Sequence, residues 1–375
     1  MNIKSLLLGS AAALVAVSGA RAADAVVIAE PEPMEYVRVC DTYGVGFFYI
    51  PGTETCLRVS GRIRYDIDFE EDDNGWRKRT QAVVNFDARS ETEYGTFRRF
   101  IRLEGNAYNN DYRNFGSQYY DDTGPGNNVK LAYGYIELGG LLVGYYDTLF
   151  DADLQVEFDQ TGDYDTVNQI RYTFNGGNGV NAALSLETYN YNETYTPNVV
   201  GNIGITQGWG GIQLWAAYDA GNDDLYFFPA YDDFYNEDSW SVKAIGTWKA
   251  TDALTIDAEV QYSSDSNGAS IYSSGYEWLV GASMIYQATD KLSFGIGAQG
   301  FFNANGADLI NIGNGEFQVI EQDGDGWNVG GQVQYNIVEN LLARLWVRYN
   351  SFDDDLDYTD EDNYFDGKFR LEATF

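Results

Sequence analysis

Residues 364–375 read YFDGKFRLEATF, and their polarity alternates strictly up to the last residue. One face carries Phe365, Gly367, Phe369, Leu371, Ala373 and Phe375, and the other carries Asp366, Lys368, Arg370, Glu372 and Thr374. This period of two predicts a β-strand with one apolar and one polar face. Because the polar face is charged along its length, the strand fits a barrel wall between lipid and water better than a sandwich core.

The same alternation recurs from residue 57 onward, in segments of about ten residues, the length of a tilted strand that crosses a bilayer. Short turns are expected at Glu91–Gly95, Gly139–Gly140, Asn175–Gly179, Gly208–Gly211, Ala250–Asp252, Ala288–Asp290 and Val338–Asn340. Long polar connections are expected at Glu70–Gly75, Asn109–Asn127, Asp147–Thr166, Asn190–Tyr195, Ala220–Glu237, Asp265–Ser274, Asn303–Asp325 and Asp353–Asn363. These seven short and eight long connections predict an all-β fold, a 16-stranded antiparallel transmembrane β-barrel with its short turns facing the periplasm.

The N-terminus has the features of a secretory signal over residues 1–22. Lys4 precedes an apolar run from Leu6 to Val17, which ends at the small-x-small site Ala20-Arg21-Ala22. The run is too short for a spanning helix, and an uncleaved anchor is the alternative. We therefore expect a cleaved signal at 1–22, an N-terminal segment at 23–56 and the barrel at 57–375. Loss of the two basic residues takes the formal net charge from −34 to −36.

The two cysteines, Cys40 and Cys56, lie sixteen positions apart in a chain that is expected to be exported. Export favours a disulfide, which in the chain-entropy model contributes on the order of 3 kcal/mol for a loop of this size. A redox-active pair is the alternative, but it lacks the C-x-x-C spacing. We interpret the pair as a structural crosslink.

Composition excludes several other functions. A charge of −34 argues against nucleic acid as a partner. The chain has no histidine, which removes the usual zinc ligand and the commonest general base. We expect no enzyme activity, no metal and no cofactor, because no nucleophile and base are recognisable together.

Sorting the strands into faces places basic side chains inside the barrel. The first three and the last two strands point arginine and lysine residues inward, and the last strand must pair with the first to close the barrel. Arg99 interrupts the pattern beside a short turn, where its side chain can reach water. The wall residues expected to line the pore are Arg62, Arg64, Arg79, Arg98, Arg102, Arg344 and Arg348.

The third long connection, Asp147–Thr166, combines acidic residues with apolar ones. Its apolar side chains are Leu149, Phe150, Leu154, Val156 and Phe158, and they are interleaved with carboxylates. A loop folded into the lumen would use the apolar side chains as anchors on the wall. The acidic residues Asp151, Asp153, Glu157 and Asp159 would then face the arginines and form a charged constriction. An external acidic loop is the alternative.

Several runs resemble the rhizobial and Brucella-type general porins of alphaproteobacteria. They are residues 37–40 (VRVC), 49–61 (YIPGTETCLRVSG), 90–96 (SETEYGT), 135–140 (YIELGG) and 172–179 (YTFNGGNG). The resemblance covers the whole chain and implies a homotrimeric diffusion channel whose third loop folds into the pore. The third loop lacks the Pro-Glu-Phe-Gly motif of enterobacterial porins. Ala373 replaces a large residue in the C-terminal assembly signal, which Phe375 completes.

These observations predict a porin in the outer membrane of a Gram-negative bacterium, open to ions and small hydrophilic solutes by passive diffusion. A substrate-specific sugar channel of the same architecture is the alternative, because aromatic residues make up 16% of the chain. The expected partners are two further copies in a homotrimer, the membrane with its lipopolysaccharide, and the barrel assembly machinery.

Overall fold

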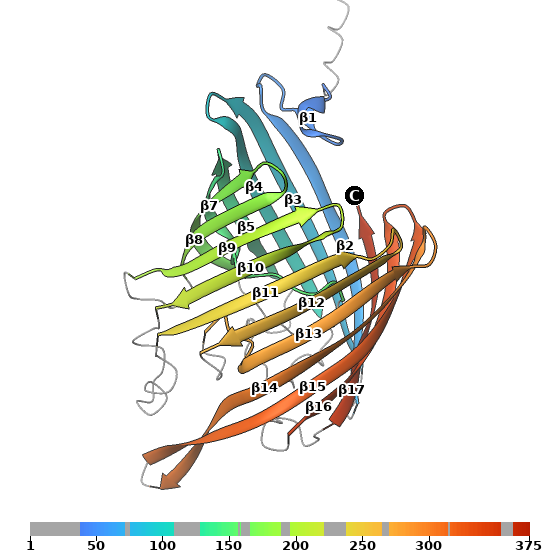
Figure 1. Ribbon diagram of the computed structural model, residues 1–375. Coiled ribbons are helices and arrows are strands. Elements are labelled where there is room, and N and C mark those ends of the chain that lie inside the picture. Colours follow the sequence, from blue (N-terminus) through green and yellow to red (C-terminus); the bar gives the residue numbers. More distant parts are fainter. Residues whose placement is uncertain are drawn as a thin grey trace, which may run out of the picture. The chain divides into compact units, whose positions relative to one another are not determined.

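The computed structural model describes residues 38–71, 76–108, 128–156, 158, 166–188, 196–220, 238–264, 270–313, 316–353 and 363–375. The compact unit Val39–Phe375 is a closed antiparallel barrel (Figure 1). Its strands are β2 (Cys56–Glu70), β3 (Arg77–Thr92), β4 (Gly95–Tyr108), β5 (Asn128–Leu138), β6 (Leu141–Asp147), β7 (Thr166–Gly176), β8 (Val180–Thr188), β9 (Asn198–Gln207), β10 (Gly210–Asp219), β11 (Ser239–Lys249), β12 (Leu254–Ser263), β13 (Tyr276–Gln287), β14 (Leu292–Gly313), β15 (Glu316–Val338), β16 (Leu341–Phe352) and β17 (Asn363–Thr374). The sixteen strands agree with the predicted number, and each pairs with its chain neighbours.

The predicted signal at residues 1–22 lies outside the described residues. Among the residues that are described, no helix is long and apolar enough to cross a membrane. A two-residue strand, β1 (Phe48–Tyr49), precedes the barrel and pairs with the start of β2.

The predicted alternation of faces is confirmed on the strands that close the barrel. On β2, Val59 and Ile63 are 42% and 53% exposed, whereas the inward Asp66 is fully buried. On β16, Val347 is 38% exposed while its neighbour Trp346 is 8% exposed. Apolar side chains therefore cover the outer surface and polar ones line the interior, as expected for a wall between lipid and water.

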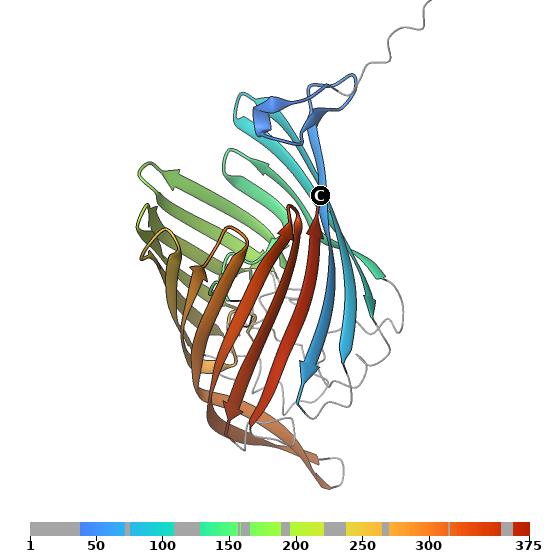
Figure 2. The ribbon, with the colours of Figure 1, turned by 90° about the vertical axis from the view of Figure 1, so that its right-hand side faces the viewer.

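Closure occurs between β17 and β2, which lie side by side in Figure 2. Three inward pairs of opposite charge face each other directly across this seam: Arg64–Glu372, Asp66–Arg370 and Asp68–Lys368. Their N–O distances are 2.7, 2.7 and 3.2 Å respectively. The backbone of Phe375 completes the seam, since its N–H donates to the Gly61 carbonyl oxygen at 3.0 Å.

The charge order at the seam distinguishes the observed register from its nearest alternatives. A slip of one residue would turn every β17 side chain to the wrong face. A slip of two residues in one direction would place Arg64 opposite Arg370, and in the other direction Asp66 opposite Glu372. Like charges directly opposite each other are destabilising. The luminal charges therefore favour one register of closure.

One predicted connection is wrong. The expected loop at Asn303–Asp325 is mostly β-structure, because β14 runs for 22 residues and β15 for 23. The two strands continue to pair with each other beyond their neighbours and form a ribbon that extends past the adjacent strands (Figures 1 and 2). Each segment contains two β-branched residues, and Asn-Gly, the residue pair typical of a tight hairpin, stands between the segments in the sequence. The density of Asn, Asp and Gly had favoured a loop.

The predicted disulfide is confirmed between Cys40 and Cys56, with a Cα–Cα distance of 6.0 Å. It closes an N-terminal knob (residues 39–55) that contains the short 3-10 helix Asp41–Tyr43. Both cysteines are buried with Phe47 in a small apolar cluster. The disulfide thus fixes the knob to the first residue of β2.

Candidate functional site

The predicted luminal arginines lie at three levels of the wall. Arg98 and Arg344 are three residues from the short-turn ends of β4 and β16, whereas Arg79 is two residues from the opposite end of β3. The remaining four, Arg62, Arg64, Arg102 and Arg348, occupy the middle of their strands. Only this middle set lies at a level where a single constriction could include all its members.

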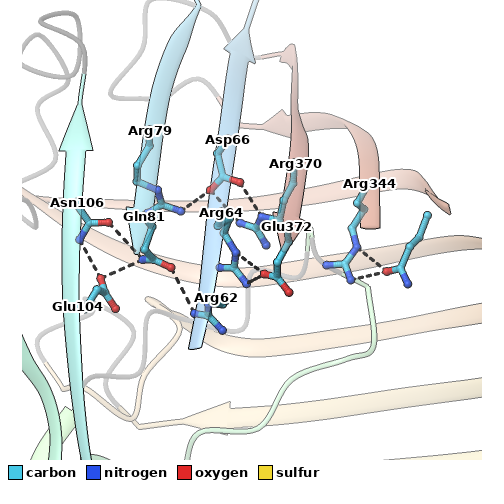
Figure 3. Close-up of polar contacts among 11 residues, drawn as sticks. Arg62, Arg64, Asp66, Arg79, Gln81, Glu104, Asn106, Arg344, Arg370 and Glu372 are labelled. Atoms are coloured by element: carbon cyan, nitrogen blue, oxygen red, sulfur yellow. Dashed lines mark hydrogen bonds and ion pairs between the residues drawn. The ribbon is translucent and has the colours of Figure 1, made fainter. Parts of the chain in front are cut away.

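Most of these arginines are paired within the wall, and Figure 3 shows the pairs Arg79–Asp66 and Arg64–Glu372. Arg79 donates to Asp66 at 2.7 Å and Arg64 to Glu372 at 2.7 Å. Arg98 binds Asp87 through two nitrogens, and Arg348 binds Asp366 in the same way. The sequence places these acids on the inner face but does not show which cation each one meets. The basic arc is therefore largely neutralised by its own carboxylates.

Two arginines in the middle of the wall have amide partners instead. Arg62 donates to Gln81 at 3.4 Å, and Arg102 donates to Asn85 at 2.9 Å. The Arg102 guanidinium also lies 4.2 Å from the ring centroid of Tyr133. Within the described residues neither arginine forms a direct ion pair, although the carboxylates of Glu104 and Glu372 lie close enough to Arg62 to interact with its charge.

The start of the third long connection packs on the wall through its apolar side chains. Phe150 is fully buried in a cluster with Val200, Ala217 and Tyr272. Further along, Leu154, Val156 and Phe158 form a second buried cluster with Trp346. These are four of the five side chains predicted from the sequence to pack on the wall, and the fifth, Leu149, packs against the first cluster.

Charged wall side chains bind the polar groups of the same segment. Glu187 accepts hydrogen bonds from the Leu149 N–H at 2.8 Å and from the Thr148 hydroxyl at 2.5 Å. Lys243 donates to the carbonyl oxygens of Phe150 and Ala152, each at 2.6 Å. Asp257 accepts from the Gln155 N–H at 2.7 Å, and Arg348 donates to the Phe158 carbonyl oxygen at 3.1 Å. The segment is thus bound by β8, β11, β12 and β16 in turn.

Sequence reasoning missed Glu187, Lys243 and Asp257 as loop-binding residues. The signal was present in part, since Glu187 is the only charged residue of β8. Glu187 is fully buried, and a buried charge is costly unless it is paired or hydrogen-bonded. An isolated charge on the inner face of a neutral strand therefore indicates a partner from elsewhere in the chain.

Two of the four acidic residues predicted to form the constriction, Asp151 and Asp153, belong to the described residues. Asp151 and Asp153 have exposed side chains, whereas the apolar residues Leu154 and Val156 that follow them are buried. Glu157 and Asp159 lie outside the described residues. Although the Asp151 side chain reaches solvent, the surrounding wall limits the bulk water around it, and Asp153 and Asp147 repel its charge. Its pKa is therefore raised to about 7 despite the opposing effect of Lys243 and Arg171.

This pKa predicts a charge on the third connection that depends on pH. Above about pH 7 Asp151 carries a negative charge, and below it the residue is neutral, so lowering the pH from 8 to 6 removes this charge from the third connection. We expect cation selectivity, measured as the reversal potential in a salt gradient, to fall over this interval. The chain has no histidine, so no imidazole contributes to the change. Asp151→Asn should flatten the pH profile, and an unchanged profile in that variant would contradict the assignment.

Comparisons with known proteins agree with this architecture. The family model of the porin subfamily matches residues 24–369. The porin Omp2b of Brucella abortus (strain 2308) is 36% identical over an alignment of 403 positions that covers 100% of both chains. Omp2b of Brucella suis biovar 1 is equally similar.

Solved structures with low sequence identity share the fold. The outer membrane channel DcaP of Acinetobacter baumannii has a TM-score of 0.63 at 12% identity, covering 87% of this chain and 99% of its own. OmpF of Salmonella typhi, in complex with daunomycin, has a TM-score of 0.58 at 12% identity, covering 86% and 98%. OmpT of Vibrio cholerae in a trimer form has a TM-score of 0.56 at 12% identity, covering 86% and 100%.

Proposed function

The chain belongs to the porin subfamily and is a passive-diffusion channel of the Gram-negative outer membrane, and from that premise we propose that its third connection narrows the pore. The family implies a channel rather than an enzyme. In our proposal the solutes are ions and small hydrophilic molecules. They pass between the connection that follows β6 and the wall that carries Arg62 and Arg102.

The observation that carries the proposal is the path of the hydrogen bonds of residues 148–158. This segment begins next to β6, yet its polar groups bind side chains of β8, β11, β12 and β16. Those side chains belong to the polar, inward face of the wall. Contacts with four strands so far apart around a closed barrel support a path across the lumen, whereas an external loop would leave these wall charges without partners.

Charge supports the same arrangement. The solvent-facing carboxylates of Asp151 and Asp153 would lie on the loop side of the passage, and the unpaired guanidinium groups of Arg62 and Arg102 on the wall side. Rows of opposite charge across a narrow water column sort ions and polar solutes by charge. We propose that Glu157 and Asp159 extend the acidic side, and that Arg64 and Arg348 mainly hold their neighbours in place.

Neutralisation of the two sides should shift ion selectivity in opposite directions. Replacing Asp151 and Asp153 with Asn should move the reversal potential toward anion selectivity. Replacing Arg62 and Arg102 with Gln should move the reversal potential toward cation selectivity, because the pore wall loses positive charge. These two substitutions break no ion pair, since both arginines donate to amide groups. Each shift should shrink as salt rises to about 1 M, where the Debye length falls to about 3 Å.

A control for this experiment is Arg99→Gln. Arg99 lies on β4 like Arg102, but its guanidinium binds Ser90 beside the short turn and packs on Phe97. The reversal potential of this variant should match the wild type. Reversal potentials that stay constant in both luminal variants at low salt would rule out the constriction.

We propose further that the channel assembles as a homotrimer, in analogy with the solved OmpT trimer. The recordings described above would then show three equal conductance steps. We also propose that the channel contacts lipopolysaccharide. The barrel assembly machinery would recognise the C-terminal strand, which ends at Phe375.

The stacked aromatic pair on β4 and β5 gives the sugar-channel alternative no support. A stacking surface for sugar rings needs aromatic faces that are open to the lumen. Phe100 and Tyr135 stack on each other at 5.2 Å and are each only 8% exposed. The Arg98 guanidinium lies over both rings, so these faces are already occupied.

A further inference from the structure

Three arginines surround a single buried carboxylate at the short-turn end of the barrel. Asp87 is 1% exposed and binds two nitrogens each of Arg89, at 2.9 and 2.7 Å, and Arg98, both at 3.1 Å. Arg58, which faces Asp87 across β2 and β3, approaches it to 3.7 Å. One carboxylate cannot neutralise three guanidinium groups, so this cluster (Arg58, Arg89 and Arg98 around Asp87) carries a net positive charge.

The acids next to the cluster do not reach Arg58. Glu137 lies 3.5 Å from a terminal nitrogen of Arg98. Glu91 accepts hydrogen bonds from the hydroxyl groups of Tyr43, at 2.7 Å, and Thr96, at 3.0 Å. The Arg58 side chain is 39% exposed, and its Nε is buried without a hydrogen-bond partner in the described structure. Arg58 is therefore the arginine of the cluster whose guanidinium can bind a further anion.

Aromatic rings hold the guanidinium groups in place. The ring of Phe47, in the N-terminal knob, lies 4.9 Å from Arg58 and 5.2 Å from Arg89. Phe47 is 2% exposed and packs with the Cys40–Cys56 disulfide. A guanidinium that is stacked on a fixed ring loses little freedom when it binds an anion, because its donors are already oriented.

The cluster lies at a different level from the proposed constriction. Arg58, Arg89 and Arg98 are each within three residues of the short-turn end of β2, β3 or β4. Arg62 and Arg102 lie four residues further along the same strands as Arg58 and Arg98. A solute moving through the lumen would therefore meet the two basic sites one after the other.

We propose that Arg58 and Arg89 form a binding site for small oxyanions at the periplasmic mouth of the channel. The chemical class is phosphate or carboxylate, because two oxygens of such a group match the planar donor fork of arginine. Arg58 supplies the free donors, and Arg89, which uses Nε and one terminal nitrogen for Asp87, supplies the other terminal nitrogen. Arg98 positions Asp87, and the N-terminal knob covers the site with Phe47.

The test uses inorganic phosphate as the probe, added to one side of a planar bilayer that contains the full-length channel. Phosphate added on the short-turn side should reduce the current in a saturable manner at low salt. Arg58→Gln should raise the half-saturating phosphate concentration about tenfold, as expected for loss of a charge-assisted hydrogen-bond pair. Orientation can be scored in a Tyr94→Cys background, since Tyr94 is 70% exposed on the β3–β4 turn.

Arg77→Gln provides a matched control. Arg77 lies at the opposite end of β3 and pairs with Glu70 at 3.1 Å, so the substitution removes the same charge at the other mouth. It should leave the short-turn-side effect of phosphate unchanged. Arg58→Lys keeps the charge but loses the fork, and it should weaken phosphate binding less than Arg58→Gln does.

Two results would overturn the proposal. One is equal phosphate sensitivity of wild type and Arg58→Gln, when both give barrels of the same heat-modifiable mobility. The other is an equal effect of phosphate from either side of the membrane. Neither result bears on the constriction, because that proposal is tested through Arg62, Arg102, Asp151 and Asp153. If Arg58→Gln does not fold, an unaltered phosphate effect in Arg58→Lys decides against the site.

Discussion

Replacing Asp66 with alanine is expected to cost the barrel about 3–5 kcal/mol of unfolding free energy, because it leaves buried cations without their anion. Asp66 is fully buried and accepts hydrogen bonds from Arg370 and Arg79, each at 2.7 Å. Arg370 itself is 6% exposed, so water cannot replace the lost carboxylate. The loss is measurable as a lower midpoint of denaturant unfolding, followed by the gel mobility of the folded barrel.

The neighbouring seam pair is the control for this effect. Asp68 faces Lys368 at 3.2 Å, but their side chains are 15% and 23% exposed, so water can solvate the lysine after the change. Asp68→Ala should therefore cost clearly less, about 1 kcal/mol. Equal losses in both variants would show that burial of Asp66 does not set the energy of the seam.

A charge exchange tests whether the seam charges select the register. Arg64→Glu alone places two acids opposite each other and should sharply lower the amount of closed barrel. Combining it with Glu372→Arg restores opposite charges in the observed register and should recover most of the yield. A double variant that assembles no better than the single one would contradict a role of this pair in closure.

Replacing Lys243 with methionine should release the third connection without unfolding the barrel. The buried ammonium group donates to two backbone carbonyl oxygens, of Phe150 and Ala152, and lies 4.6 Å from the Phe150 ring centroid. Each carbonyl left without a donor costs about 1–3 kcal/mol. We expect faster amide exchange in residues 148–156 and a higher single-channel conductance, while the unfolding midpoint of the barrel changes little.

The matched control is Lys249→Met on the same strand. Lys249 is exposed at the short-turn end of β11, so its loss should leave both exchange and conductance as in the wild type. Unchanged exchange at residues 148–156 in Lys243→Met would mean that other contacts, such as those of Glu187, are sufficient to hold the segment.

Sequence by itself determined the barrel and the direction of its side chains. The period of two in residues 364–375 depends only on the geometry of a strand, so the inward set Asp366, Lys368, Arg370 and Glu372 could be read directly. The alternation of short and long connections gave the strand number for the same reason, because each connection is a local feature. The expected loop at residues 303–325 is wrong, because Asn, Asp and Gly are common there but pairing between β14 and β15 decides the structure.

Tertiary structure alone decided which charges meet. Asp66 follows Arg64 by two positions on the same face of β2, but its partners are Arg79 on the next strand and Arg370 at the other end of the chain. Closure brings β2 and β17 together, and no local pattern reveals which of several inward cations lies within 3 Å of a given carboxylate. For that reason the sequence predicted a basic arc, whereas most of its arginines are neutralised within the wall. The charge of this lumen is set by pairing across strands, which depends on the register of closure.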